Sequence, residues 1–149
     1  MNNNIIERNE RIQKVSQVIS MLPERTIVVN DLTGALQHIQ GTRWSTVARG
    51  RTLGQATPPM FTDAEGEAHL FEAAVIRLST NKDQMRVLTS LLNAVLTPDA
   101  TIWVVGGNDE GIKSFPKTAP EFVVDVQTVD IRQRARVLKG VPTANSRAL

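Results

Sequence analysis

The glycine-rich stretch from Val104 to Ser114, VVGGNDEGIKS, contains the residue types of a phosphate-binding turn. Glycines let backbone amides approach a phosphate, and a lysine and a serine follow closely. A P-loop requires glycine, four residues and then Gly-Lys-Ser/Thr, whereas Ile112 here separates Gly111 from Lys113. A dinucleotide-binding turn requires Gly-x-Gly-x-x-Gly after the first strand, and neither the spacing nor the late position fits. The stretch is therefore predicted to be a tight turn from a strand into a short helix.

Basic residues near the end of the sequence are candidates for binding RNA. They are Arg132, Arg134, Arg136 and Lys139. Alternate residues of an extended strand project from one face, so these side chains are expected to form one basic surface. With Lys113 they could contact phosphates, each adding to a salt-dependent affinity. A second basic group consists of Arg43, Arg49 and Arg51. The alternative is an edge strand that its charges protect from aggregation.

Histidines and carboxylates give no catalytic or metal site in the sequence. His38 and His69 have no obvious carboxylate or nucleophile partner nearby, which favours placement at the surface or in the core. Three acids alternate with small residues and could bind a cation, but a solvated loop is the commoner case: Asp63, Glu65 and Glu67. Two further acids are expected to favour the N-terminus of the following helix through its dipole: Asp109 and Glu110.

The aromatic residues are candidates for stacking on bases. An amino-group methyltransferase acting on a base uses an Asn/Asp-Pro-Pro-aromatic turn, in which the ring stacks on the flipped base. The run from Thr57 to Phe61, TPPMF, departs from it because threonine replaces Asn/Asp and the aromatic residue is one place late. Trp44 and Trp103 could stack on bases, although the apolar run around Trp103 favours the core.

Composition predicts one globular domain. The chain has 149 residues, 41% of them apolar and 21% charged, with a net charge of +2. That charge alone does not indicate nucleic acid. The absence of cysteine excludes disulfides and thiolate sites and fits a reducing compartment. No apolar run is long enough to span a membrane and the polar start is no signal peptide, so the expected location is cytoplasmic.

The first half of the chain is predicted to contain an amphipathic helix and two strands. Apolar residues recur at helical spacing over the first 20 residues or so, and Pro23 follows. The β-branched run from Thr26 to Asp31 is expected to be a buried strand. Asp31 could then cap a short helix through Gln40, and residues 44–49 are a candidate second strand. The segment 50–68 is expected to be a loop.

The second half alternates more clearly between strand and helix patterns. A strand is expected from Ala73 to Leu78, followed by a helix with capping-box-like spacing at Thr80 and Asp83. Pro98 is expected to end this helix, and residues 101–105 form the strand before the glycine turn. Two extended segments joined around residues 130–132 complete the sequence. This order predicts a three-layer, Rossmann-like α/β sheet, mostly parallel with a C-terminal antiparallel strand pair.

The block from Ala73 to Ser114 resembles the N-terminal domain of the class I S-adenosylmethionine-dependent methyltransferases that modify guanine N2 in small-subunit ribosomal RNA. In that family a strand ends in a VGENxxGxxS turn, and four residues here stand at matching places: Gly106, Asn108, Gly111 and Ser114. The ending RQRARVLKG is similar to the family's closing strand, with Arg134 where histidine is common. The sequence departs from the family at Ser79 and Thr80, where Pro-Lys is usual. The resemblance covers about residues 25 to 140.

The resemblance implies a division of labour between two domains. In that family the first methyltransferase-like domain is degenerate and supports folding or substrate recognition, and the second binds the cofactor and performs catalysis. A working class I site also needs a glycine-rich loop after its first strand and an acid after its second. The run TIVVNDLTGAL supplies only Gly34. No catalytic, cofactor-binding or metal-binding residue is therefore expected in this chain.

The leading hypothesis is a non-catalytic methyltransferase-like domain over residues 1–140, with a linker-like tail at 141–149. Its expected partners are ribosomal RNA and a catalytic methyltransferase domain, in cis or in trans, which would bind S-adenosylmethionine. Two alternatives remain: a small methyltransferase with an atypical cofactor site, and a stand-alone interaction module.

Overall fold

A computed structural model describes residues 3–46, 57–118 and 123–143. A helix, α1 (Asn3–Val15), continues into a 3₁₀ turn, η1 (Ser16–Val18), as the sequence predicts. Strands β1 (Thr26–Val29) and β2 (Thr42–Trp44) follow. A small hairpin comprises β3 (Phe61–Thr62) and β4 (Ala68–His69). The remaining elements are β5 (Phe71–Arg77), α2 (Lys82–Asn93), β6 (Leu96–Gly107), two 3₁₀ turns, η2 (Asn108–Glu110) and η3 (Ile112–Ser114), α3 (Phe115–Thr118), β7 (Val123–Arg132) and β8 (Ala135–Pro142).

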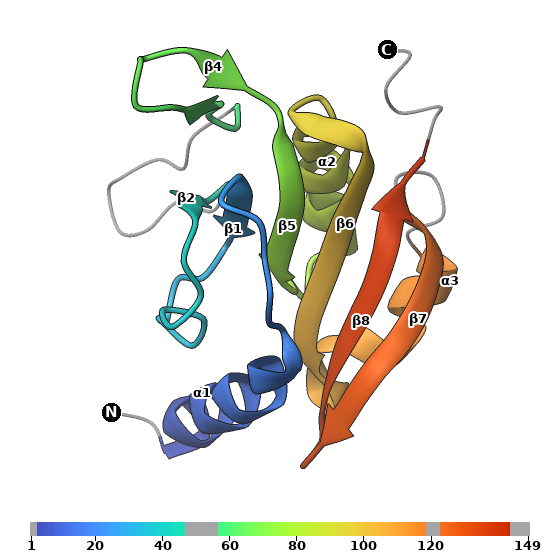
Figure 1. The fold of residues 1–149 in the computed structure, drawn as a ribbon. Helices are drawn as coiled ribbons and strands as arrows, with labels where there is room; N and C mark the ends of the chain where they lie inside the picture. Colours follow the sequence, from blue (N-terminus) through green and yellow to red (C-terminus); the bar gives the residue numbers. More distant parts are fainter. Residues whose placement is uncertain (1–2, 47–56, 119–122, 144–149) are drawn as a thin grey trace.

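Six strands form one sheet in the order β2-β1-β5-β6-β8-β7 (Figure 1). The first four are parallel, and β8 pairs antiparallel with both β6 and β7. The α/β fold with a C-terminal antiparallel pair is therefore confirmed. From β1 the chain adds β2 on one side and β5 on the other, so the strand order reverses at β1 and β5. In open α/β sheets, ligands bind beyond the carboxyl ends of the strands at such a reversal.

Helix α1 covers one face of the sheet. Its residues Ile12 and Val15 are fully buried and pack with apolar residues of the central strands and of β8, among them Val105 and Val137. Burial of this apolar stripe stabilises α1, because isolated helices of this length are marginal in water. In Figure 1, α1 lies across the end of the sheet toward which β5 and β6 run.

Helix α2 covers the opposite face and buries Met85, Leu88 and Leu92. Its first turn is capped by Asn81, whose side-chain oxygen accepts a hydrogen bond of 3.0 Å from the backbone N–H of Gln84. The predicted capping pair, Thr80 and Asp83, is therefore wrong by one position. The helix ends at Asn93, and Pro98 lies within β6 instead of ending the helix.

The segment 31–40 forms turns, so the predicted short helix is wrong. The Asp31 carboxylate accepts from the backbone N–H of Leu36 at 3.1 Å, and Gly34 has a positive φ of 79°. The Arg43 guanidinium donates to the carbonyls of three residues, Leu36, Gln37 and Ile39. These side-chain contacts satisfy backbone groups that a helix would have paired internally.

Two boundaries differ from the predicted ones, which were a second strand at residues 44–49 and a tail that begins at residue 141. Strand β2 begins at Thr42 and ends at Trp44, and residues 47–56 lie outside the described part of the chain. Strand β8 continues to Pro142, and residues 144–149 likewise lie outside it. Within the described ranges, no helix is long and apolar enough to cross a membrane.

Candidate functional site

The glycine turn follows β6 at the carboxyl edge of the sheet, where the sequence placed it. A Cβ on Gly106 would lie 2.9 Å from side-chain atoms of Leu78, so the close approach of the two strands requires glycine. Gly111 has φ +91°, a conformation that other residues rarely adopt. The Ser114 hydroxyl donates to the carbonyl of Gly111 at 3.1 Å, and the backbone N–H of Asn108 donates to the carbonyl of Arg134 at 2.7 Å. The four matched residues thus shape the turn and join it to the β7–β8 hairpin.

A buried ion pair lies at the carboxyl end of β5. Both guanidinium nitrogens of Arg77 donate to Glu110, at 2.8 and 2.9 Å, and both side chains are about nine-tenths buried. Glu110 also accepts from the backbone N–H of Gly107 at 2.7 Å. Two parallel charge-assisted bonds fix the geometry of such a pair. The carboxylate therefore ties the last residue of β5 to the glycine turn.

An exposed ion pair joins the same turn to helix α1. Arg8 donates to Asp109 at 2.8 Å, and this hydrogen bond lowers the pKa of the Asp109 carboxyl below 3.8. As the sequence predicts, Asp109 and Glu110 lie in the first turn of a helical segment, the short η2, and Glu110 accepts from the N–H at its start. Their arginine partners, Arg8 and Arg77, were not predicted.

The carboxyl ends of β1 and β2 are joined by side-chain hydrogen bonds. Asn30, directly after β1, is 5% exposed and has a left-handed backbone with φ 59°. Its side-chain oxygen accepts from the backbone N–H of Thr46 at 2.9 Å, and its own backbone N–H donates to the carbonyl of Trp44 at 2.9 Å. The polar groups at the strand-order reversal are thus bonded to one another.

The predicted basic surface on one strand face is wrong. Arg132 ends β7, and Arg134 lies in the hairpin turn with φ 67°. In β8, Arg136 pairs with Gly106, on the α2 side of the sheet, whereas Lys139 pairs with Trp103, on the α1 side. Residues three apart in a strand project from opposite faces, so Arg136 and Lys139 separate. Lys113 is exposed in η3, and Arg43 is held by backbone carbonyls. Arg49 and Arg51 lie outside the described residues.

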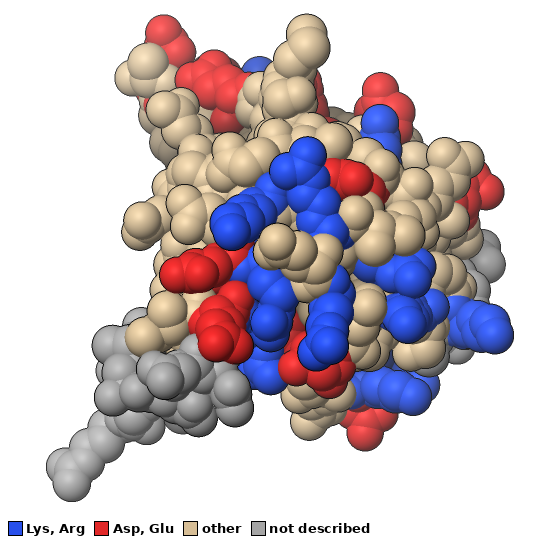
Figure 2. Space-filling view, turned by 90° about the horizontal axis from the view of Figure 1, so that it is seen from below, with Lys and Arg blue, Asp and Glu red and all other residues tan. Residues whose placement is uncertain are grey.

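The structure instead gathers basic side chains at the carboxyl edge of the sheet. Figure 2 views this end and shows lysine and arginine side chains close together, with carboxylates among them. Arg134 shares a hollow of about 400 Å³ with Arg11 and Lys14 of α1, which Glu7 and Glu10 also line. Lys113 belongs to the same end, because the glycine turn is bonded to Arg134. We call Arg11, Lys14, Lys113 and Arg134 the basic edge.

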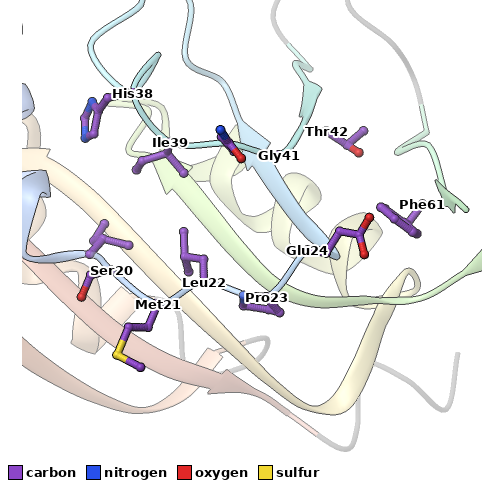
Figure 3. Close-up of a pocket in the computed structure, with 12 residues that line it drawn as sticks. Ser20, Met21, Leu22, Pro23, Glu24, His38, Ile39, Gly41, Thr42 and Phe61 are labelled. Carbon is purple, nitrogen blue, oxygen red and sulfur yellow. The ribbon is translucent and has the colours of Figure 1, made fainter.

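The proline-rich run at 57–61 lies at the other end of the sheet. Phe61 contacts Phe71, the first residue of β5, edge-on at 6.3 Å, and the Arg25 guanidinium lies 5.9 Å from the centre of the Phe61 ring. Phe61 also lines a hollow of about 530 Å³ with residues 19–24 and 38–42 (Figure 3). The run thus lies near the amino end of β5, away from the glycine turn.

The two histidines differ in their surroundings. His38 lies 3.1 Å from the Ser16 hydroxyl, and partial burial lowers its pKa below 6.5. His69 has a carboxylate partner that the sequence did not reveal, Asp63, at 2.6 Å. Ligand atoms of Asp63, Glu67 and His69 lie within 4.8 Å of one another. Asp63 also accepts from backbone N–H groups of the β3–β4 turn, so these contacts give it a structural role in the hairpin.

Sequence reasoning missed three residues that organise the carboxyl edge, Arg8, Asn30 and Arg77, and it named Glu110 without its arginine partner. One signal was present, because Arg77 is the single charge in the apolar run from Ala73 to Leu78. A charge in a buried strand requires a partner. Its partner lies 33 residues further along the chain, beyond the reach of local patterns.

Solved structures, including those of two methyltransferases, share this fold. The 16S rRNA N2 G1207 methyltransferase RsmC of T. thermophilus, in complex with AdoMet and guanosine, is 14% identical with a TM-score of 0.59; the match covers 91% of this chain and 38% of that one. The mitomycin 7-O-methyltransferase MmcR is 9% identical with a TM-score of 0.58, over 91% of this chain and 54% of that one. The PH0226 protein of Pyrococcus horikoshii is 8% identical with a TM-score of 0.55, over 95% and 92%.

Sequence comparison identifies the family. No curated protein matches the chain. The family model for the N-terminal domain of the methyltransferase small domain matches residues 15–147, which is most of the sequence. The chain also spans well under half the length of the RsmC structure that it matches. The resemblance seen in the sequence is thereby confirmed: this chain belongs to the methyltransferase small domain N-terminal family.

Proposed function

We propose that this chain is a non-catalytic domain of a ribosomal RNA guanine-N2 methyltransferase, which recognises RNA or supports a separate catalytic domain. The observation that carries the proposal is the Arg77–Glu110 pair at the carboxyl edge of the sheet. This edge is where open α/β folds bind their ligands. Here the buried arginine and glutamate bind each other.

The strand ends at the order reversal support the same proposal. A class I cofactor site requires a glycine-rich turn after the first strand, and β1 is followed by Asn30 and Asp31. Asn30 is bonded to Thr46, and both oxygens of Asp31 accept from Leu36. The two side chains thus stabilise turns, and S-adenosylmethionine is assigned to the partner domain.

RNA recognition is assigned to the basic edge. Arg11, Lys14 and Arg134 border one hollow, and Lys113 extends the group across the glycine turn. Arginine and lysine bind phosphates regardless of base sequence, and each contact adds to the salt dependence of affinity. Glu7 and Glu10 in the same hollow limit how closely a phosphate chain approaches α1.

Binding of a ribosomal RNA fragment, measured by gel retardation at about 50 and 200 mM salt, tests this assignment. We expect affinity to fall steeply with salt in the wild type. Lys113→Gln and Arg134→Asn should each weaken binding and make the slope shallower by just under one unit. Asparagine is chosen because it tolerates the left-handed backbone at residue 134. Arg86→Gln, an exposed change on α2, is the matched control and should have no effect.

Calorimetric titration with S-adenosylmethionine tests the absence of a cofactor site. We expect no heat of binding. Micromolar affinity would contradict the proposal and support a small methyltransferase with an atypical site.

A further inference from the structure

A second hollow lies on the α1 face of the sheet, beyond the area that α1 covers. Its volume is about 470 Å³. The segment Ser20–Pro23 forms one wall and separates it from the hollow beside His38. In Figure 3, Leu22 points toward that other hollow, and Met21 points away from it. None of the helices in the described part of the chain covers the upper parts of β6 and β8 on this face (Figure 1). Its polar and aromatic lining includes Glu72, Thr97, Asp99, Trp103 and Lys139.

Trp103 presents part of its ring to this hollow. It lies on the same face of β6 as Val105, which α1 buries completely, but Trp103 itself is only partly buried. The Lys139 ammonium lies over the Trp103 ring, 5.0 Å from its centre. Trp44, by contrast, is 3% exposed and belongs to the core on the α2 side. The expectation that Trp103 is a core residue is therefore only partly correct.

We infer that this hollow binds an unpaired guanine base of single-stranded RNA, stacked on Trp103. The inference rests on the proposed RNA-recognition function and assigns it a base-binding site. Base stacking on an aromatic side chain is stronger than an exposed cation–π contact. The exposed Lys139 side chain can therefore leave the ring when a base arrives and contact the adjoining phosphate.

The polar lining selects guanine. Glu72 and Asp99 border the hollow and offer carboxylate oxygens, which only accept hydrogen bonds when ionised. Guanine presents two adjacent donors on its Watson–Crick edge, the N1–H and the N2 amine, whereas uracil has one N–H between two carbonyls. Among the described residues, the Thr97 hydroxyl is a buried group without a hydrogen-bond partner. A buried hydroxyl of this kind calls for a partner, and a base in the hollow can supply one once the Thr97 side chain turns toward it.

The hollow lies further along β8 from the basic edge, beyond the part of the sheet that α1 covers. Lys139 and Arg134 are five residues apart along β8 and its turn, about 16 Å at the rise of a strand. An extended RNA strand held by Arg134, Arg11 and Lys14 can cross over α1 to Lys139. The carboxylates at the far side of the hollow then meet the base and not the phosphates.

Tryptophan fluorescence of the full chain tests the inference directly. The probes are two uridine hexamers that differ at one position, one with a single guanosine and the other with a single adenosine. We expect saturable quenching by both, with at least threefold tighter binding of the guanosine probe. Trp103→Leu should abolish the quenching and weaken retardation of the guanosine probe in gels by about five- to a hundredfold.

Two sets of exposed variants separate the parts of the site without disturbing the core. Glu72→Gln/Asp99→Asn should make the two probes bind equally while quenching persists. Lys139→Met should weaken both probes alike and reduce the salt dependence. Glu65→Gln, a carboxylate in the β3–β4 turn, is the matched control and should leave the preference unchanged.

Each outcome decides between the two proposals. Gel retardation of the guanosine probe without quenching overturns the base site and leaves the basic edge standing. Quenching that Arg134→Asn and Lys113→Gln do not weaken supports the base site and contradicts the basic edge. Neither retardation nor quenching overturns both. An emission change that depends on protein concentration, without RNA, shows that a second copy of the chain covers Trp103 and overturns the base site.

Discussion

Arg77 and Glu110 face each other at the carboxyl edge of the sheet through two parallel hydrogen bonds, in a place where little water reaches them. Burying two charges costs solvation energy that their attraction only partly returns, so such a pair adds little net stability. Its effect is positional: the pair fixes the glycine turn relative to β5. Removal of Arg77 leaves the Glu110 carboxylate buried without its main counter-charge, since the Arg8 Nε lies 3.9 Å away.

Arg77→Met should therefore lower the free energy of unfolding by about 3–5 kcal/mol, measured by urea denaturation. Arg77→Met/Glu110→Gln should recover most of this loss, because glutamine is neutral and can still accept from the backbone of Gly107. A single variant within about 1 kcal/mol of the wild type would contradict the buried pair.

The carboxyl group of Asp109 should titrate below pH 3.8 in an NMR experiment, because Arg8 donates a hydrogen bond to its charged form. Arg8→Met should move the midpoint upward, and Arg11→Met should move it less, since Arg11 acts only through charge. The folded-state pKa is depressed, so the contribution to stability is present above pH 3.8 and is lost as the pH falls through the folded-state pKa. Its size should stay within about 1 kcal/mol for an exposed pair.

Asn81→Ala should destabilise the protein by about 1 kcal/mol in thermal or urea unfolding, because it removes the acceptor for the Gln84 N–H. Thr80→Ala is the neighbouring control and should change stability by less than about 0.5 kcal/mol. An equal loss of stability in the two variants would contradict Asn81 as the cap and support the predicted cap at Thr80.

Gly111→Ala should cost about 1–2 kcal/mol, because an added Cβ is strained at φ +91°. Gly111→Asn should cost less, since asparagine adopts positive φ more readily. Space is available at this position, so strain and not a clash is what calorimetric unfolding would measure. Identical transition temperatures for the two variants would show that the loss of stability does not come from backbone strain.

The main strands and helix α2 could be predicted because each has a characteristic local sequence pattern. The run from Thr26 to Val29 is β-branched and fully buried, and α2 repeats its apolar residues at helical spacing. The sequence of residues 31–40 also suggested a helix, with Asp31 as its cap. The segment forms turns instead, because the side chains of Arg43 and Asp31 bind its backbone groups. The contacts of Arg43 depend on where strand β2 places this residue in the fold. A local sequence pattern cannot predict that position.

The candidate sites could be predicted only in part, for the same reason. The glycine turn was located because its residues are contiguous. Arg132, Arg134, Arg136 and Lys139 were grouped by spacing, but the hairpin turn occupies residues 133 and 134 and the spacing from Arg136 to Lys139 is odd. The basic edge takes Arg11 and Lys14 from the opposite end of the chain, and only the folded sheet brings them to Arg134.

The contact between α1 and the last strands affects how the chain folds as it is synthesised. Arg8 and Asp109 are 101 residues apart, and the apolar stripe of α1 packs on Val105 and Val137. Some partners of α1, including Val28 and Leu36, are synthesised soon after it, whereas its contacts with β6 and β8 form only after those strands have followed. Contacts so distant in sequence slow folding and leave apolar surface open to association in the interval. Expression yield should consequently depend on chaperones more than the size of the domain suggests.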